Sequence, residues 1–162
     1  MQYHHCDVSD AAAVEALSRS IDAEHGPPAV LVTCAALIPN TESLMTMDLD
    51  AHGRMWRVNY DGTLHACRSF GGRMVDGARG GAIVTIGSIN SVHPMPLAAY
   101  NPGKVAIARL TQLLACELGR HGIRVNSVAP TFVMSPELQA RIAAGLRDRA
   151  KIMALHALPE LP

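Results

Sequence analysis

The sequence has 162 residues, of which 49% are hydrophobic and 17% are charged, a composition that suits a domain with a buried core and excludes a disordered chain. Fourteen basic and fourteen acidic side chains cancel, so the charge does not indicate binding to nucleic acid or to an acidic membrane surface. The longest apolar run, residues 29–38, is about half of the ~20 residues that a membrane-spanning helix needs. The first residues lack a signal-peptide pattern, so we expect a soluble, cytoplasmic protein with one domain over residues 1–162.

The N-terminal half of the chain predicts two strands and two helices. Residues 2–6 are a candidate strand, and Ser9 is the expected cap of a helix that ends near Gly26. The apolar residues 29–32 predict a buried strand, of the kind found in a parallel sheet with both faces covered. A long helix is expected from about residue 48 to residue 74.

The C-terminal half continues this alternation. Residues 82–86 and 123–128 predict two more buried strands, and residues 100–118 predict a helix between them. Ser135 and Pro136 are expected to cap and open a last helix. Strands that alternate with helices predict an α/β fold with a mostly parallel sheet, whose ligands bind at the carboxyl ends of the strands.

The cysteines do not indicate disulfides or a metal site. They are few and lack metal-binding spacing, so we expect reduced, buried small residues at Cys6, Cys34, Cys67 and Cys116. His4, His5 and Cys6 are consecutive on a predicted strand, where side chains alternate between faces, so we predict no metal.

A possible acid/base pair lies beyond the strand that ends before Ser88. Tyr100 and Lys104 are four residues apart and therefore share one face of a helix. A nearby ammonium group favours the phenolate, so we expect Lys104 to lower the tyrosine pKa below its usual value of ~10. The pair is weak evidence by itself, and the serine at the strand end strengthens it.

Four motifs run through the chain: CDVSD near the start, WRVNYDGT in the long helix, AIVTIGSINSVHPMPLAAYNPGK, and GIRVNSVAPTFVMSPEL. Together they resemble the short-chain dehydrogenase/reductase family over residues 3 to about 140. The resemblance implies a Rossmann-like, doubly wound, mostly parallel sheet, present here in part. It also implies an oxidoreductase that uses NAD or NADP to interconvert a small or medium alcohol and its ketone.

The resemblance implies four catalytic residues. Tyr100 would be the general acid/base, and Lys104 would lower its pKa and hold the nicotinamide ribose. Ser88 would hydrogen-bond the substrate oxygen, and Asn59 would anchor a water in a proton relay through Lys104. The alternatives are an ordinary strand-end hydroxyl for Ser88, with Ser91 close enough to take its role, and an ordinary helix-surface amide for Asn59.

Cofactor contacts are implied at the carboxyl ends of the strands. Besides Tyr100 and Lys104, the implied residues are Asp7, Val8, Cys34, Ala35, Ala36, Pro130, Val133 and Ser135. Asp7 and Val8 match the adenine-contacting pair of the family, and Val133 and Ser135 flank the nicotinamide carboxamide. Asp7 alone would also suit a turn or cap, and His93 faces either substrate or solvent.

The sequence departs from the family in three places. The NNAG turn reads Thr33-Cys34-Ala35-Ala36, and the proline-glycine after the last strand reads Pro130-Thr131. None of the 13 glycines has another glycine two positions on, so the turn that cradles the pyrophosphate is missing. From the resemblance, we expect the sequence to begin at the family's third strand and to stop before its last. We therefore expect these 162 residues to bind dinucleotides weakly, and a non-catalytic interaction or oligomerisation module is the alternative function.

The helices 48–74 and 100–118 are expected to form a homo-oligomer, a dimer or a tetramer. Leu113 and Leu114 diverge by about 100° on a helix, so they do not both face the sheet.

Overall fold

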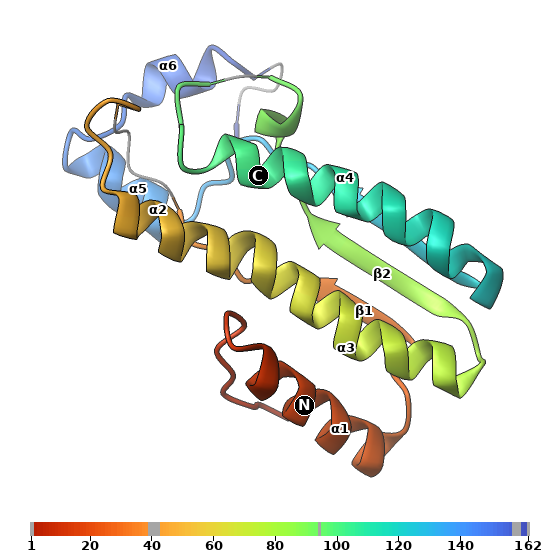
Figure 1. The fold of residues 1–162 in the computed structure, drawn as a ribbon. Coiled ribbons are helices and arrows are strands. Elements are labelled where there is room, and N and C mark those ends of the chain that lie inside the picture. Colours follow the sequence, from red (N-terminus) through yellow and green to blue (C-terminus); the bar gives the residue numbers. More distant parts are fainter. Residues whose placement is uncertain (1, 39–42, 94, 157–159, 162) are drawn as a thin grey trace. The chain divides into compact units, whose positions relative to one another are not determined.

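The computed structural model describes residues 2–38, 43–93, 95–156 and 160–161 (Figure 1). The chain divides into two compact units, Met1–Ala129 and Pro130–Pro162. A single domain over residues 1–162 stays a prediction.

The first unit contains a parallel sheet of three strands in the order β1-β2-β3. The strands are β1 (Val30–Thr33), β2 (Gly81–Ile86) and β3 (Ile123–Val128), and each pair is parallel. The predicted α/β class with a parallel, Rossmann-like sheet is confirmed. β3 has the predicted bounds, whereas β1 and β2 begin one residue later and one residue earlier than expected.

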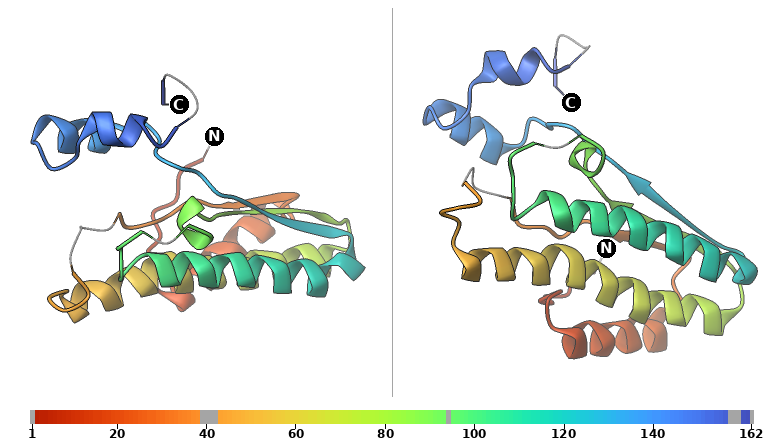
Figure 2. Two further views of the ribbon diagram at one scale, coloured as in Figure 1. Left: turned by 90° about the horizontal axis from the view of Figure 1, so that it is seen from above. Right: turned by 45° about the horizontal axis from the view of Figure 1, so that its top comes forward.

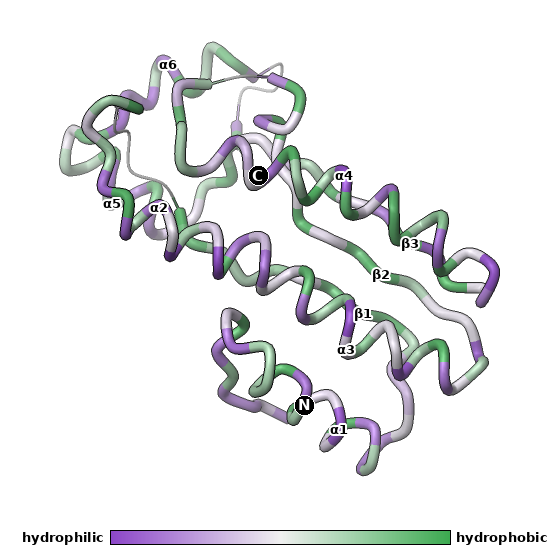
Figure 3. Tube along the Cα trace, in the orientation of Figure 1, coloured by the Kyte–Doolittle hydropathy of each residue, from purple (hydrophilic) through white to green (hydrophobic). Residues whose placement is uncertain are grey.

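Helices of the first unit cover one face of this sheet. They are α1 (Ala11–His25), α2 (Leu49–Trp56), the π-helical turn η1 (Arg57–Asp61), α3 (Gly62–Gly77) and α4 (Asn101–Leu118). Figure 2 shows α1, α3 and α4 on the same side of the strands. Apolar and polar residues alternate along α3 and α4 in Figure 3, as expected for helices with one buried face.

The core lies between the sheet and α3 and α4. Its buried cluster consists of Cys67, Met74, Ile83, Leu118, Ile123 and Val125. Beside it, the hydroxyl of Thr111 lies 2.8 Å from that of Thr85, and it also donates to the carbonyl of Ile107 at 2.8 Å. These bonds satisfy two hydroxyl groups that would otherwise be costly to bury.

The long predicted helix is a continuous helical segment with a π turn inside it. Asp48 caps α2 by accepting from the N–H groups of Asp50 and Ala51. The π turn η1 then connects α2 to α3, which ends at Gly77 rather than Met74. The helical residues after Tyr100 begin as expected, with Tyr100 itself in the N-cap position of α4.

The predicted strand at residues 2–6 is wrong. These residues lie outside helices and strands, and Tyr3 is 85% exposed. The Gln2 side chain instead contacts the end of α1, at 3.1 Å from Glu24 and 2.8 Å from His25. The segment is mostly polar, so its burial in a sheet would gain little hydrophobic free energy.

The predicted cap of α1 is also wrong. One carboxylate oxygen of Asp10 accepts from the N–H groups of Ala12 and Ala13, at 2.8 and 3.1 Å. Ser9 instead donates to Asp7. The Asp10 carboxylate thus satisfies two of the open N–H groups of the first turn, and its negative charge is favourable at a helix N-terminus. Gly26 ends α1 as expected, with a φ of 79°.

The second unit carries two short helices, α5 (Pro136–Ala143) and α6 (Arg149–Met153). Ser135 caps α5 as predicted, by accepting from the N–H of Leu138 at 3.2 Å, and Pro136 is its first residue. α6 has no counterpart in the sequence analysis. Among the described residues, no helix is long and apolar enough to cross a bilayer.

Candidate active site

Ser88, Tyr100 and Lys104 lie at the carboxyl end of β2 and at the start of α4. Ser88 caps the short 3₁₀ turn η2 (Ile89–Ser91), which follows β2 directly. Tyr100 and Lys104 are one helical turn apart, and the Lys104 Nζ atom lies 5.4 Å from the centre of the tyrosine ring. The structure thus brings together three of the predicted catalytic residues.

Lys104 is almost fully buried, with 3% of its surface exposed. Its ammonium donates to the carbonyl of Ile86, the last residue of β2, at 2.7 Å. Burial lowers the pKa of Lys104, and the electrostatic interaction with the nearby Cys34 acts in the opposite direction. The lysine is therefore anchored to the sheet by one of its three donor protons.

The expected lowering of the Tyr100 pKa is wrong for this structure. Burial raises the pKa of Tyr100, and the hydrogen bond with the Ser88 side chain counteracts this only in part. Desolvation penalises the phenolate more than its surroundings stabilise it, and the ammonium of Lys104 contributes no resolved effect.

The structure favours Ser88 over Ser91 as the serine of the site. Ser91 donates its hydroxyl to the backbone carbonyl of Ser88 at 2.7 Å. The Ser88 hydroxyl accepts from the N–H of Asn90 at 3.1 Å and forms a hydrogen bond with the Tyr100 side chain. Only 6% of Ser88 is exposed. His93 is exposed to solvent.

Asn59 is buried in the π turn η1 and is not a helix-surface amide. Its Oδ1 atom accepts from the N–H of Leu37 at 2.7 Å, and its Nδ2 atom donates to the carbonyl of Leu37 at 3.1 Å. Only 4% of Asn59 is exposed. The side chain therefore fixes the segment after β1, and its part in a water relay stays a prediction.

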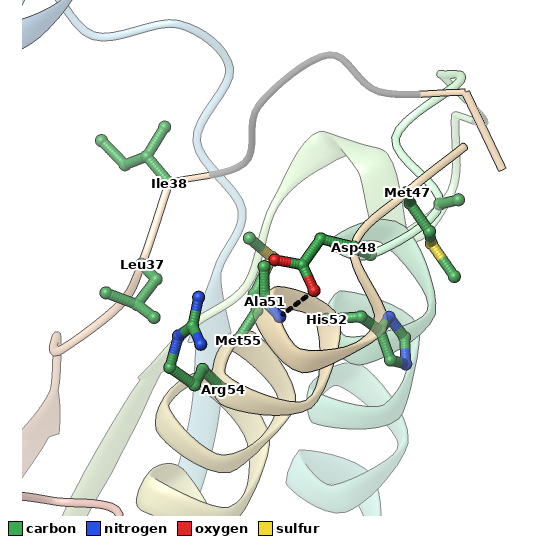
Figure 4. Close-up of a pocket in the computed structure, with 10 residues that line it drawn as sticks. Leu37, Ile38, Met47, Asp48, Ala51, His52, Arg54 and Met55 are labelled. Atoms are coloured by element: carbon green, nitrogen blue, oxygen red, sulfur yellow. Dashed lines mark hydrogen bonds between the residues drawn. The ribbon is translucent and has the colours of Figure 1, made fainter.

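A pocket of about 190 Å³ adjoins this segment and α2. Leu37 forms part of its wall, and Ala98 and Ala99, which precede Tyr100, form another part. Figure 4 shows Leu37, Arg54 and Met55 beside the first turns of α2. The sequence analysis did not predict Leu37 as a residue of the site. Its position directly after the turn that follows β1 was the only feature of the sequence that pointed to it.

The turn after β1 contains the three expected cofactor residues Cys34, Ala35 and Ala36, all of them exposed. Beside them, the hydroxyl of Thr33 is buried and has no hydrogen-bond partner among the described residues. A buried hydroxyl without a partner is costly, and it is therefore a candidate contact for a bound polar molecule.

Asp7 and Val8 lie in a turn before α1. The Asp7 carboxylate accepts from the backbone and the hydroxyl of Ser9, and these bonds lower its pKa. Asp7 is thus a turn residue, and its contact with adenine stays a prediction. Among the described residues, no cluster of three metal-ligating side chains occurs.

The remaining expected cofactor residues, Pro130, Val133 and Ser135, belong to the second unit. Val133 is 48% exposed, and Ser135 caps α5. Thr131, which replaces the family's glycine, lies with its hydroxyl 2.7 Å from the Nε2 atom of His156. Contact of these residues with nicotinamide stays a prediction.

A parallel α/β sheet with a buried serine, a half-buried tyrosine and a buried lysine at its carboxyl end defines a Rossmann-like domain. A family model described as "Enoyl-(Acyl carrier protein) reductase" matches residues 1–159. The chain belongs to the short-chain dehydrogenase/reductase family.

Several curated relatives of the chain carry dehydrogenase names. Galactitol 2-dehydrogenase from Rhizobium johnstonii is 40% identical over 139 residues, which are 83% of this chain and 53% of that protein. (3R)-3-hydroxyacyl-CoA dehydrogenase from Homo sapiens is 37% identical over 82% of this chain and 51% of its own length. The chain spans about half the length of these curated relatives.

Solved structures match the fold closely. ElxO with NADP bound is 27% identical, with a TM-score of 0.92 over 99% of this chain and 64% of that chain. A gluconate 5-dehydrogenase from Burkholderia cenocepacia, in complex with NADP and tartrate, is 28% identical, with a TM-score of 0.80. This match covers 89% of the present chain and 55% of the other.

Proposed function

We propose that the protein is an NAD(P)-dependent oxidoreductase that interconverts a small or medium alcohol and its ketone. The observation that carries this proposal is that the buried Ser88 and Lys104 and the half-buried Tyr100 lie together at the carboxyl end of β2. A phenol beside a hydroxyl donor and a cation can exchange a proton with a carbonyl or alcohol oxygen. The dehydrogenase names of the relatives support the same chemistry.

The residues of the site fit the ribose of a nicotinamide nucleotide. Lys104 uses one donor on Ile86, which leaves two for ribose hydroxyls, and the Thr33 hydroxyl is buried without a partner among the described residues. The NADP-bound relatives support this cofactor class, NAD or NADP. The nicotinamide would supply or accept the hydride.

Tyr100 would move the proton that accompanies this hydride. Because burial raises its pKa, the phenol keeps its proton through neutral pH and can protonate a carbonyl oxygen. Alcohol oxidation needs the phenolate, so its rate should increase as the pH rises toward that pKa. Ser88 would hold the substrate oxygen, and Asn59, through Leu37, would keep the adjoining pocket wall in place.

The replacement Tyr100→Phe tests this function. It keeps the ring and removes the transferable proton, so we expect kcat/KM to fall by about 100- to 10,000-fold on a substrate of the wild-type protein. Tyr3→Phe is the matched control, because Tyr3 is 85% exposed and lies outside the site. Near-wild-type turnover by the Tyr100 variant would falsify the acid/base role.

We further propose that the protein works as a homo-oligomer in the cytoplasm. Leu113 on α4 is 59% exposed, which supports a further contact surface on that helix. All four cysteines are free thiols, which supports a reducing compartment.

A further inference from the structure

The turn that contains Asp7 and Val8 is built by its own hydrogen bonds. One carboxylate oxygen of Asp7 accepts from the N–H of Ser9 at 2.9 Å and from its hydroxyl at 2.8 Å. The carbonyl of Asp7 accepts from the N–H of Asp10 at 3.1 Å. These bonds fix the backbone of the turn and the orientation of the carboxylate.

Two polar groups of the turn stay open. Among the hydrogen bonds of the described residues, none uses the second carboxylate oxygen of Asp7 or the N–H of Val8. An acceptor and a donor on consecutive residues complement the edge of adenine, where an amino group lies beside a ring nitrogen. Their use as a pair requires that the turn holds a fixed place relative to α3 and the sheet.

Two residues of α3 give the turn that place. The Nδ1 atom of His65 lies 3.0 Å from the carbonyl oxygen of Val8. Because a carbonyl only accepts, Nδ1 must carry the proton of this bond. Gly62, three residues earlier and on the same face of the helix, provides the space: a Cβ atom there would lie 2.7 Å from the Val8 Cγ2 atom.

We propose that His65 is a positioning residue for adenine recognition, with Gly62 as its steric partner. His65 donates to the Val8 carbonyl and so fixes the orientation of Val8. The backbone N–H of Val8 is thereby directed at the adenine edge. The inference rests on the proposed NAD(P)-dependent function. It adds a role for two residues of α3, neither of which is expected to touch the cofactor itself.

The docking of α1 does not depend on this contact. Further along the two helices, the guanidinium of Arg73 on α3 donates to Glu15 on α1 at 2.7 Å. Val14 and Ser18 of α1 are almost fully buried. Loss of the His65 bond should therefore displace the turn while α1 stays packed on α3.

The experiment compares His65→Phe with His65→Asn. Phenylalanine keeps a ring but has no donor, whereas the Asn side-chain N–H can occupy nearly the place of Nδ1–H. Calorimetric titration of the full chain with AMP and, separately, with nicotinamide mononucleotide distinguishes the two halves of the cofactor. We expect His65→Phe to weaken AMP binding about 3- to 10-fold, with nicotinamide mononucleotide unchanged and AMP binding restored in His65→Asn.

A second pair of variants uses glycines of the same helix. Gly62→Ala places a methyl group against Val8, whereas Gly72→Ala meets no atom within 4 Å. Alanine favours a helix over glycine, so neither change should unfold α3. We expect weaker AMP binding and faster hydrogen exchange at the Ser9 and Asp10 amides for Gly62→Ala alone.

The outcomes separate this inference from the function on which it rests. The positioning role is overturned if His65→Phe binds AMP as tightly as the wild type does. It is also overturned if His65→Asn loses as much AMP affinity as His65→Phe. If the wild type binds nicotinamide mononucleotide but not AMP, only the adenine assignment fails. If it binds neither nucleotide, the proposed function fails together with the inference.

Discussion

The two faces of the sheet differ sharply although the same strands form both. On the face toward the helices, Ile83 and Thr85 of β2 have no exposed surface. On the other face, Val30 and Val32 of β1 are 61% and 54% exposed, and Val128 of β3 is 52% exposed. Successive side chains of a strand point to opposite faces, so the apolar run of each strand supplies residues to both faces.

This difference shows what the apolar runs encode. A strand that is buried on one side alternates apolar and polar residues, whereas β1 is apolar on both sides. Among the described residues of the first unit, helices lie on one side only (Figure 2). The residues of β1 therefore suit a strand that is covered on both faces, and three measurements test whether the two faces differ in solution.

The largest contrast is expected in thiol reactivity. Burial in the core raises the pKa of Cys67 to about 12, whereas Cys34 and Cys116 are exposed. At pH 8 only about one Cys67 in 10,000 is a thiolate, so we expect Cys67 to react with a disulfide reagent at least ~100-fold more slowly than Cys34 or Cys116. Mass spectrometry of the labelled peptides gives the rates. Equal rates at Cys67 and Cys34 would show that the covered face opens readily.

Truncation of apolar side chains should give the next largest contrast. Ile83→Ala removes a fully buried side chain from the core and should lower the free energy of unfolding by about 2–5 kcal/mol. Val32→Ala changes an exposed residue and should cost less than about 1 kcal/mol. Denaturant titration measures both. A similar loss for the two variants would mean that the second face is also covered in solution.

The smallest change in stability is expected on the outer side of α4. Leu110 and Leu118 are buried, whereas Leu113 is 59% exposed. Leu113→Glu should change the unfolding free energy by no more than about 0.5 kcal/mol but convert the proposed oligomer to monomer. Leu146→Glu, at a 70% exposed site in the second unit, is the control. Light scattering that finds wild-type monomer at micromolar concentration would remove the oligomer.

The elements that the sequence predicts well have strong local boundaries. β3 has the predicted residues because Gly122, with a φ of 70°, precedes it and Pro130 follows soon after. The cap at Ser135 is likewise a local signal. Residues 2–6 lack such support, because a strand forms only with a neighbour and no local pattern shows whether one is present.

The sequence predicts which residues form the site but not the direction in which the pKa of Tyr100 changes. Ser88, Tyr100 and Lys104 follow from their motif, and the structure brings them together. The direction of the Tyr100 pKa depends on how deeply the phenol is buried and on where the Lys104 ammonium is bonded. Both are long-range consequences of packing, and so is the bond from Asn59 to Leu37.

The π-helical turn η1 makes residue count, and not only residue type, a condition of the site. The hydrogen bonds of a π turn span five residues rather than four, so η1 holds one residue more than an α-helical turn, and deleting one residue between Met55 and Asn59 would convert it to α-helix. Asn59 would then lose the placement from which it bonds Leu37, although every side chain of the pocket wall were still present. Descendants of this chain can therefore exchange side chains along α2 far more freely than they can change the length of η1.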